Sequence, residues 1–128
     1  MLALVGVLAA IVVPRASSLV ERLSVHAASR DVVLALASAR AGAAHRGEFV
    51  SFVADARTGR VRVVAGGGIL MERDVAGARG VRLDATRESV TFAPTGLGWG
   101  AANTTVVVSR GSRADTIVTS RLGRVRHP

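Results

Sequence analysis

The C-terminal segment holds the side chains best suited to bind a ligand. Arg121, Arg124 and Arg126 lie close together, and His127 follows them. On an extended strand, Arg124 and Arg126 point to the same face about 7 Å apart, close to the phosphate separation along one nucleic-acid strand. Guanidinium groups also match the geometry of phosphate oxygens. The segment is therefore a candidate DNA-binding element, and solvated arginines at the end of a strand are the alternative explanation.

The charge of the whole chain bears on the same question. All 17 basic residues are arginines, and the formal net charge is +8. Such an excess attracts polyanions such as nucleic acid or anionic lipid headgroups. The codon usage of a GC-rich genome is the alternative cause. Arg110 and Arg113 fall in an expected turn and would extend the C-terminal patch. DNA binding of this kind would be non-specific and would weaken steeply with salt.

The sequence supports no catalytic chemistry. The 3 histidines, His26, His45 and His127, share no metal-ligand spacing, and there is no cysteine. No GxSxG motif places a serine nucleophile. The glycine-rich segments 66–68 and 96–100 lack the lysine of a phosphate-binding loop and are predicted to be turns. We therefore expect no enzyme activity, no cofactor, no metal and no small-molecule substrate.

Residues 1–14 contain no charge and no hydrogen-bonding side chain. Lipid, a partner helix or a protein core must cover such a stretch in water, and it is shorter than the roughly 20 apolar residues that cross a bilayer. Its small residues would let helices pack closely in lipid. These candidate packing positions are Ala3, Gly6, Ala9, Ala10 and, at an expected kink, Pro14. An ordinary membrane anchor without a partner helix is the alternative.

Residues 15–46 have the period of an α-helix. Apolar residues recur at steps of three and four, and they form one stripe. Gly47 is a plausible end of the helix. The stripe consists of Val25, Ala28, Val32, Leu36, Ala39 and Ala43.

After Gly47 the period changes to two, which predicts strands. The segment 55–59 carries a turn signal between two alternating runs and predicts a hairpin. The turns recur as in a small antiparallel sheet or sandwich. We expect an α+β protein with a helix over 1–46, of which 1–14 is membrane-embedded, and a β-rich head over 47–128. The expected strands cover 48–54, 60–64, 69–72, 81–83, 88–92, 104–109, 116–119 and 122–126.

Four segments together resemble a known family. Residues 6–14 (GVLAAIVVP) resemble the apolar helix of type IV pilins and type II secretion pseudopilins. The helix end 38–47 (SARAGAAHRG), the turn 90–96 (VTFAPTG) and the terminal element 123–126 (GRVR) resemble the minor branch with H-type pseudopilins and FimT-like pilins. The resemblance implies a pilin-like fold and a single helix in the bacterial inner membrane. It also implies a periplasmic head and assembly with other pilins in a filament.

The resemblance implies one of two functions. The first is a minor pseudopilin, a structural subunit of a type II secretion pseudopilus that serves protein secretion. The second is a FimT-like minor pilin that binds double-stranded DNA for uptake in natural transformation. In FimT-like proteins a terminal Gly-Arg-x-Arg element is associated with DNA capture, and residues 123–126 match it. Neighbouring genes for secretion or for competence would separate the two.

The start of the family pattern is missing from this sequence. Family members begin with a basic leader ending in glycine, followed by a phenylalanine and a glutamate, and the leader is removed and the new terminus methylated. Met1 aligns with a position several residues after the start of the mature helix of the family. We expect a start codon assigned too late, with the glycine-phenylalanine junction and the glutamate encoded upstream. A true truncation, which could not be processed, is the alternative.

Overall fold

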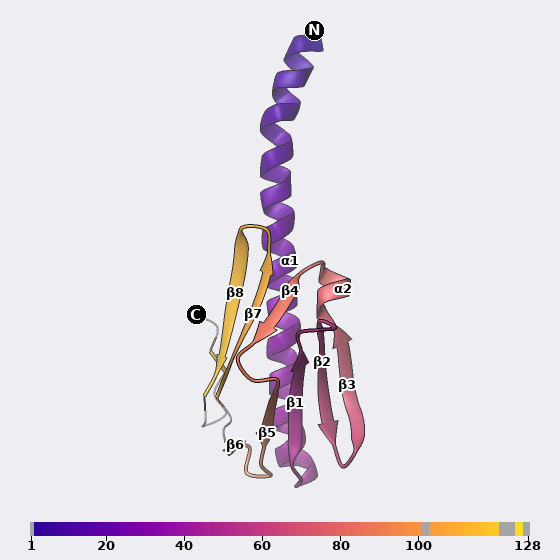
Figure 1. Cartoon of the computed structure of the whole chain (residues 1–128), viewed down its shortest axis with the longest axis vertical. Coiled ribbons are helices and arrows are strands. Elements are labelled where there is room, and N and C mark those ends of the chain that lie inside the picture. Colours follow the sequence, from indigo (N-terminus) through magenta and orange to yellow (C-terminus); the bar gives the residue numbers. More distant parts are fainter. Residues whose placement is uncertain (1, 101–102, 121–124, 127–128) are drawn as a thin grey trace.

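A single long helix runs the length of the molecule, and two small sheets lie beside its second half (Figure 1). The structure, a computed structural model, describes residues 2–100, 103–120 and 125–126. Helix α1 spans Leu2–Arg46, and the short helix α2 spans Val75–Arg79. The predicted α+β architecture, a long helix on antiparallel strands, is confirmed.

Helix α1 continues through Pro14 and ends where the sequence predicted. Gly47 has a φ of +65°, and its backbone N–H donates to the carbonyl oxygen of Ala43 at 3.0 Å. A left-handed glycine of this kind closes many helices. Among the described residues, no helix contains a stretch that is both long and apolar enough to cross a membrane.

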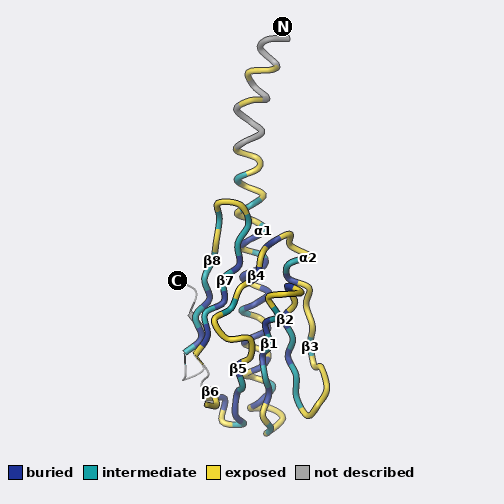
Figure 2. Tube along the Cα trace, viewed as in Figure 1, coloured by how far each residue is buried: buried dark blue, intermediate teal, exposed yellow. Residues whose placement is uncertain are grey.

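The apolar stripe of α1 is the helix side of the core. Its six predicted members, from Val25 to Ala43, are all buried. Ala35, the polar Ser29 and the acidic Asp31 are buried as well. Figure 2 shows the change along the helix, from exposed turns beyond the head to buried turns within it. The period of the sequence therefore identified the correct face.

The first sheet has the strand order β3-β2-β1-β5-β6. All its neighbouring strands are antiparallel, and β1 alternates between buried and half-buried side chains. Its buried side chains Val50, Phe52 and Ala54 belong to the same core as the stripe of α1. The strands are β1 (Val50–Asp55), β2 (Arg60–Ala65), β3 (Gly68–Asp74), β5 (Ser89–Phe92) and β6 (Gly98–Trp99).

The second sheet has the order β4-β7-β8-β9 and is also antiparallel. Val106, Val108 and Ile117 are buried in the shared core, so α1 packs against strands of both sheets. The expected strands are present with shifted ends. The members of this sheet are β4 (Arg82–Ala85), β7 (Thr104–Arg110), β8 (Arg113–Thr119) and β9 (Val125–Arg126).

The sequence did not predict α2 or β6. Helix α2 begins where an Asp74 side-chain oxygen accepts from the N–H of Gly77 at 2.9 Å, and it ends at Gly80, which has a φ of 64°. Gly59, with a φ of +71°, packs so closely on Ala76 that a side chain there would collide. The β1–β2 turn and α2 therefore support each other.

Leu36 and Leu34 offer a matched test of this packing. Leu36 is fully buried, whereas the Leu34 side chain is 52% exposed on the same helix. We expect Leu36→Ala to lower the free energy of unfolding by about 2–5 kcal/mol, because it removes buried methyl groups and leaves a cavity. Leu34→Ala should change it by less than about 0.5 kcal/mol. Denaturant unfolding of both variants in mild detergent measures the difference, and equal losses would contradict the assignment of the two faces.

Candidate functional site

The C-terminal arginine element is described only in part. Val125 and Arg126 form the edge strand β9, in which Arg126 lies opposite Val118 and Val125 opposite Thr119. Arg121 and Arg124 lie outside the described residues, as does His127. Of the strand predicted over 122–126, residues 125–126 are present and 122–124 lie outside the described residues; the predicted DNA contacts stay a prediction.

Arg110 and Arg113 do not extend that element, contrary to expectation. They pair with each other beside the β7–β8 turn, whereas β9 pairs with the other end of β8, roughly 17 Å away along the strand. Both side chains turn to α1 instead. Arg110 Nη1 donates to Ser24 Oγ at 2.8 Å, and Arg113 Nη2 donates to Ser18 Oγ at 3.4 Å. The hairpin therefore uses these arginines to dock on the helix.

The predicted packing positions lie on the part of α1 that projects beyond the head (Figure 1). Gly6 and Ala10 are exposed, and no atom of a neighbouring residue lies near the position a side chain of Gly6 would take. Ala3, Ala9 and Pro14 are helical, and their side chains lie outside the description. The same helix exposes further large apolar side chains, namely Val7, Leu19, Val20, Leu23 and Leu34.

A buried carboxylate joins α1 to the head. Asp31 is only 7% exposed, and its Oδ2 accepts a hydrogen bond of 3.0 Å from Arg79 Nε. This hydrogen bond and the charge of Asp31 raise the pKa of Arg79. Arg73 Nη1 lies 3.9 Å from the other carboxylate oxygen. The carboxylate thus ties α1 to the residues before and within α2. Sequence reasoning missed it, although an acidic residue inside an apolar stripe was a usable signal.

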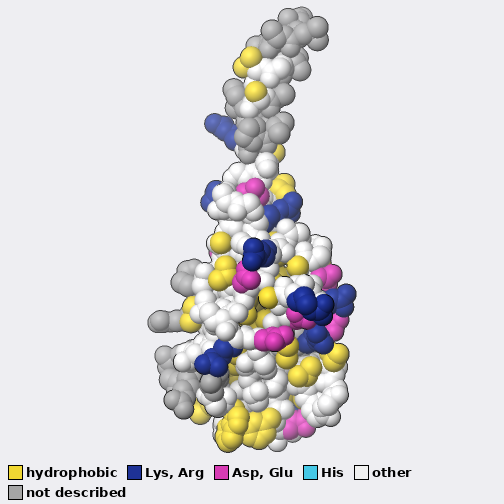
Figure 3. Space-filling view, viewed as in Figure 1, with side chains coloured by type: hydrophobic (Ala, Val, Ile, Leu, Met, Phe, Trp, Pro, Cys, Tyr) yellow, Lys and Arg dark blue, Asp and Glu magenta, His cyan; other side chains and the backbone are white. Residues whose placement is uncertain are grey.

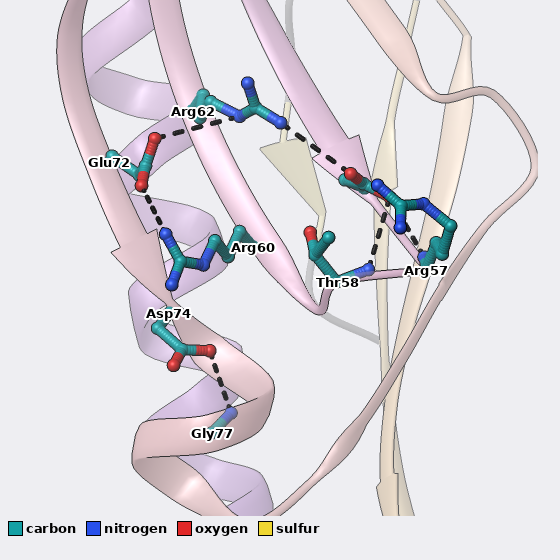
Figure 4. A pocket seen from close by; sticks show the side chains of 8 residues that line it. Arg57, Thr58, Arg60, Arg62, Glu72, Asp74 and Gly77 are labelled. Atoms are coloured by element: carbon teal, nitrogen blue, oxygen red, sulfur yellow. Dashed lines mark hydrogen bonds and ion pairs between the residues drawn. The ribbon is translucent and has the colours of Figure 1, made fainter.

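An open hollow of about 470 Å³ between β2, β3 and α2 contains most of the other charged pairs (Figure 4). Arg60 Nη1 contacts Glu72 Oε1 at 2.8 Å. Arg62 lies between two carboxylates, with its Nε 3.8 Å from Glu72 Oε2 and its Nη2 3.6 Å from Asp55 Oδ2. The Thr58 hydroxyl, by hydrogen bonding, is the main cause of the lowered pKa of Asp55. These ion pairs form a structural network, in which Arg62 Nε is buried without a hydrogen bond.

Two of the scarce aromatic residues pair on the surface. Phe49 and Trp99 stack edge to face with ring centroids 5.1 Å apart, and they are 48% and 62% exposed. Leu97 is also exposed. Figure 3 shows hydrophobic side chains gathered at the end of the molecule away from the N-terminus. Among the described residues, no group of three or more His, Asp or Glu could hold a metal ion.

Comparison with known proteins identifies relatives of the fold and of the sequence. The family model "Type II transport protein GspH" matches residues 28–123. The type IV minor pilin FimU of Pseudomonas aeruginosa superposes with a TM-score of 0.71 at 18% identity, covering 84% of this chain and 90% of that one. The minor pseudopilin EpsH from the type II secretion system of Vibrio cholerae gives 0.56 at 14% identity, covering 84% and 95%. A search of curated protein sequences finds no match. The pilin-like fold is thereby confirmed.

The Asp31 contact can be tested against a solvated pair. Asp31→Asn keeps the shape and removes the charge, so we expect the free energy of unfolding to fall by about 1–2 kcal/mol. Asp84→Asn, which breaks the exposed Arg82–Asp84 pair of 3.0 Å, should cost less than about 0.5 kcal/mol. Denaturant unfolding measures both. A loss at Asp84 as large as that at Asp31 would refute the structural role of the buried carboxylate.

The hydrogen bond between the Thr58 hydroxyl and Asp55 gives a prediction about the pKa of Asp55. Thr58→Val should raise the pKa of Asp55 toward its ordinary value, because the hydroxyl hydrogen bond that favours the carboxylate is lost. A carboxyl group whose pKa is lowered by folding stabilises the fold at pH values above its ordinary pKa. That stabilisation is lost as the pH falls through the lowered pKa. A carboxyl NMR titration of both proteins measures the shift. Titration of Asp55 at the same pH in both would contradict this assignment.

Proposed function

The chain belongs to the GspH family of type II transport proteins, and on that premise we propose that it is a minor pseudopilin. Its role is structural: it is a subunit of a type II secretion pseudopilus that serves protein secretion. The supporting observation is that large apolar side chains lie on two sides of α1, although the outer side also carries the exposed Arg30. One face is buried under the sheets, and the other exposes Leu19, Leu23 and Leu34 along the helix.

The outer face suits a partner helix better than it suits water. Large apolar side chains aligned on one helix mark an interaction site when nothing in the same chain covers them. Leu23 and Leu34 are eleven residues apart, which brings them nearly to the same side of the helix. The small residues Gly6 and Ala10 are exposed nearer the N-terminus, on the side of the helix that continues the buried stripe. Packing of such helices side by side would build the filament and leave the heads outside.

The same surface supports the proposed location. We infer that the beginning of α1 lies in the bacterial inner membrane as part of a single pass, with the head in the periplasm. On assembly the helix would exchange lipid contacts for contacts with other pilin-like subunits. Burial of its apolar side chains is then retained, and close packing replaces the hydrophobic driving force that is absent in lipid.

Leu23 and Ile69 give a matched pair for testing assembly. Both are exposed to nearly the same extent, 58% and 57%, but only Leu23 lies on α1. We expect Leu23→Glu to abolish incorporation into filaments, because it places a charge in the helix–helix contact. Ile69→Glu should assemble normally. Recovery of each variant with sheared filaments from cells measures incorporation, and unfolding curves check that both fold. If both variants are incorporated equally, this helix face does not mediate assembly.

DNA uptake is the second candidate function, supported by the position of β9. This strand is at the edge of the second sheet, so Arg126 belongs to a strand with one side unpaired in the described structure. Together with Arg124 it fits the terminal Gly-Arg-x-Arg pattern. In this alternative the protein is a minor pilin that contacts incoming double-stranded DNA through phosphates.

Salt dependence tests the DNA candidate. If Arg124 and Arg126 each neutralise one phosphate, Arg124→Ala plus Arg126→Ala should reduce the slope of log affinity against log salt by about 1.8. Arg57→Ala plus Arg87→Ala is the matched control, because both side chains are exposed on the head. Gel shifts with duplex DNA over a range of salt concentrations measure the slope. Equal affinity of the C-terminal variant and the unaltered protein would exclude this function.

A further inference from the structure

The β7–β8 turn rests on α1 close to where the helix leaves the head. Ser112 Oγ donates to Glu21 Oε2 at 3.3 Å, and Gly111 lies against the same carboxylate. Arg113 reaches one turn further, to Ser18. At 1.5 Å per residue, Ser18 is only about 5 Å along the axis from Arg15. The turn is therefore the part of the second sheet nearest the N-terminal half of α1 (Figure 1).

Arginines gather around the helix at this level. Arg15 and Arg22 are exposed on α1, and Arg110 and Arg113 flank the turn. We call these four residues the arginine rim. The acidic groups beside them are Glu21 and Asp115, so the rim keeps a positive excess. Glu21 also accepts the hydrogen bond from the hairpin turn.

Two hollows flank α1 at the rim. One, of about 340 Å³, lies between the helix and β8, with Arg22 and Arg113 among its lining residues and Leu23 and Val25 beside them. The other, of about 610 Å³, lies on the side of α2, where Arg110 joins Arg79 and Arg30. His26 lines both hollows, and Asp31 holds Arg79 by an ion pair. Each hollow thus offers guanidinium groups beside an apolar helix surface.

Exposed apolar side chains occupy the same level as the rim. Leu19, Val20 and Leu23 are 54%, 48% and 58% exposed, respectively. Arginines mixed with leucine and valine on one helix surface are typical of a membrane interface, where long side chains extend toward the bilayer and the cations meet headgroups.

We propose that the arginine rim binds the phosphate-bearing headgroups of anionic phospholipids in the membrane that holds α1, before the subunit enters a filament. The inference rests on the proposed membrane-anchored role. The headgroup layer on each side of a bilayer is about 5–7 Å thick. With Arg15 at the inner boundary of this layer, Ser18 lies within it and Glu21, on which the hairpin turn rests, lies about 9 Å from Arg15, just beyond it. The long side chains of Arg22 and Arg113 can therefore extend to the headgroups.

Charge favours lipid over a second copy of the chain at this place. Two rims brought together would set arginines against arginines, and like charges in an interface oppose association. An anionic membrane instead attracts every rim arginine at once, and the attraction falls off within a Debye length. The rim would hold the head upright on the membrane, with its outer α1 face accessible to the next subunit.

Lipid titrations followed by native mass spectrometry test the proposal. The full-length protein in a neutral detergent is titrated with phosphatidylglycerol and, separately, with zwitterionic phosphatidylcholine. Each rim arginine is worth about a fivefold change in affinity for an anionic surface. Arg15→Gln plus Arg22→Gln should therefore weaken phosphatidylglycerol binding by about 25-fold and leave phosphatidylcholine unchanged. Arg57→Gln plus Arg87→Gln removes the same charge elsewhere on the head and should change neither lipid.

The results distinguish lipid binding by the arginine rim from membrane anchoring by α1. Equal affinity for the two lipids, an equal loss in the control variant, or displacement of phosphatidylglycerol by inorganic phosphate would overturn the inference. Formation of dimers instead of lipid adducts would also overturn it, in favour of a second copy. Carbonate extraction of membranes from cells tests the anchor independently. If the protein resists extraction but shows no preference for phosphatidylglycerol, the proposed function stands and only lipid binding by the arginine rim is refuted.

Discussion

Close packing between an alanine-rich helix face and two sheets is the constraint on which the structure depends. Ala28, Ala35, Ala39 and Ala43 are all fully buried, so strands of both sheets can approach the α1 backbone. Larger side chains such as Leu36 fill the spaces between them. Because one helix serves two sheets, its register determines where every other contact falls. The hairpin docking on Ser18, Glu21 and Ser24 and the ion pair of Asp31 follow from that register.

The two faces of α1 differ both in what covers them and in composition, because the exposed side also carries Arg22 and Arg30. Leucine occurs on both, but Leu36 is enclosed and Leu34 is not. A helix whose second face is apolar and uncovered is incomplete as a monomer, since exposed apolar patches mark interaction sites. Assembly beside similar helices would complete it in the same way that the sheets complete the inner face.

Local periodicity explains what could be predicted from the sequence. The helical stripe and its end at Gly47 were identified, and so were most strands, because each is a repeating pattern in consecutive residues. Helix α2 was missed because a five-residue helix shows no period and depends on one Asp74 cap. Strand β6 is two residues long and exists through its pairing with β5. The expected extension of the C-terminal patch by Arg110 failed for a different reason: in the antiparallel sheet the β7–β8 turn and β9 lie at opposite ends of β8, although they are close in sequence.

The two candidate anion-binding sites lie in different parts of the chain. Within the described residues, several head arginines form ion pairs with nearby carboxylates, namely Arg60, Arg62, Arg73, Arg79 and Arg82. The arginine rim lies at the β7–β8 turn, and β9 pairs with the far end of β8. A single phosphate headgroup bound at the rim would not reach β9, because roughly 17 Å of strand separates the two ends of β8. The net charge of +8 therefore does not by itself favour DNA binding over lipid binding. Each end of β8 must be tested with its own variants.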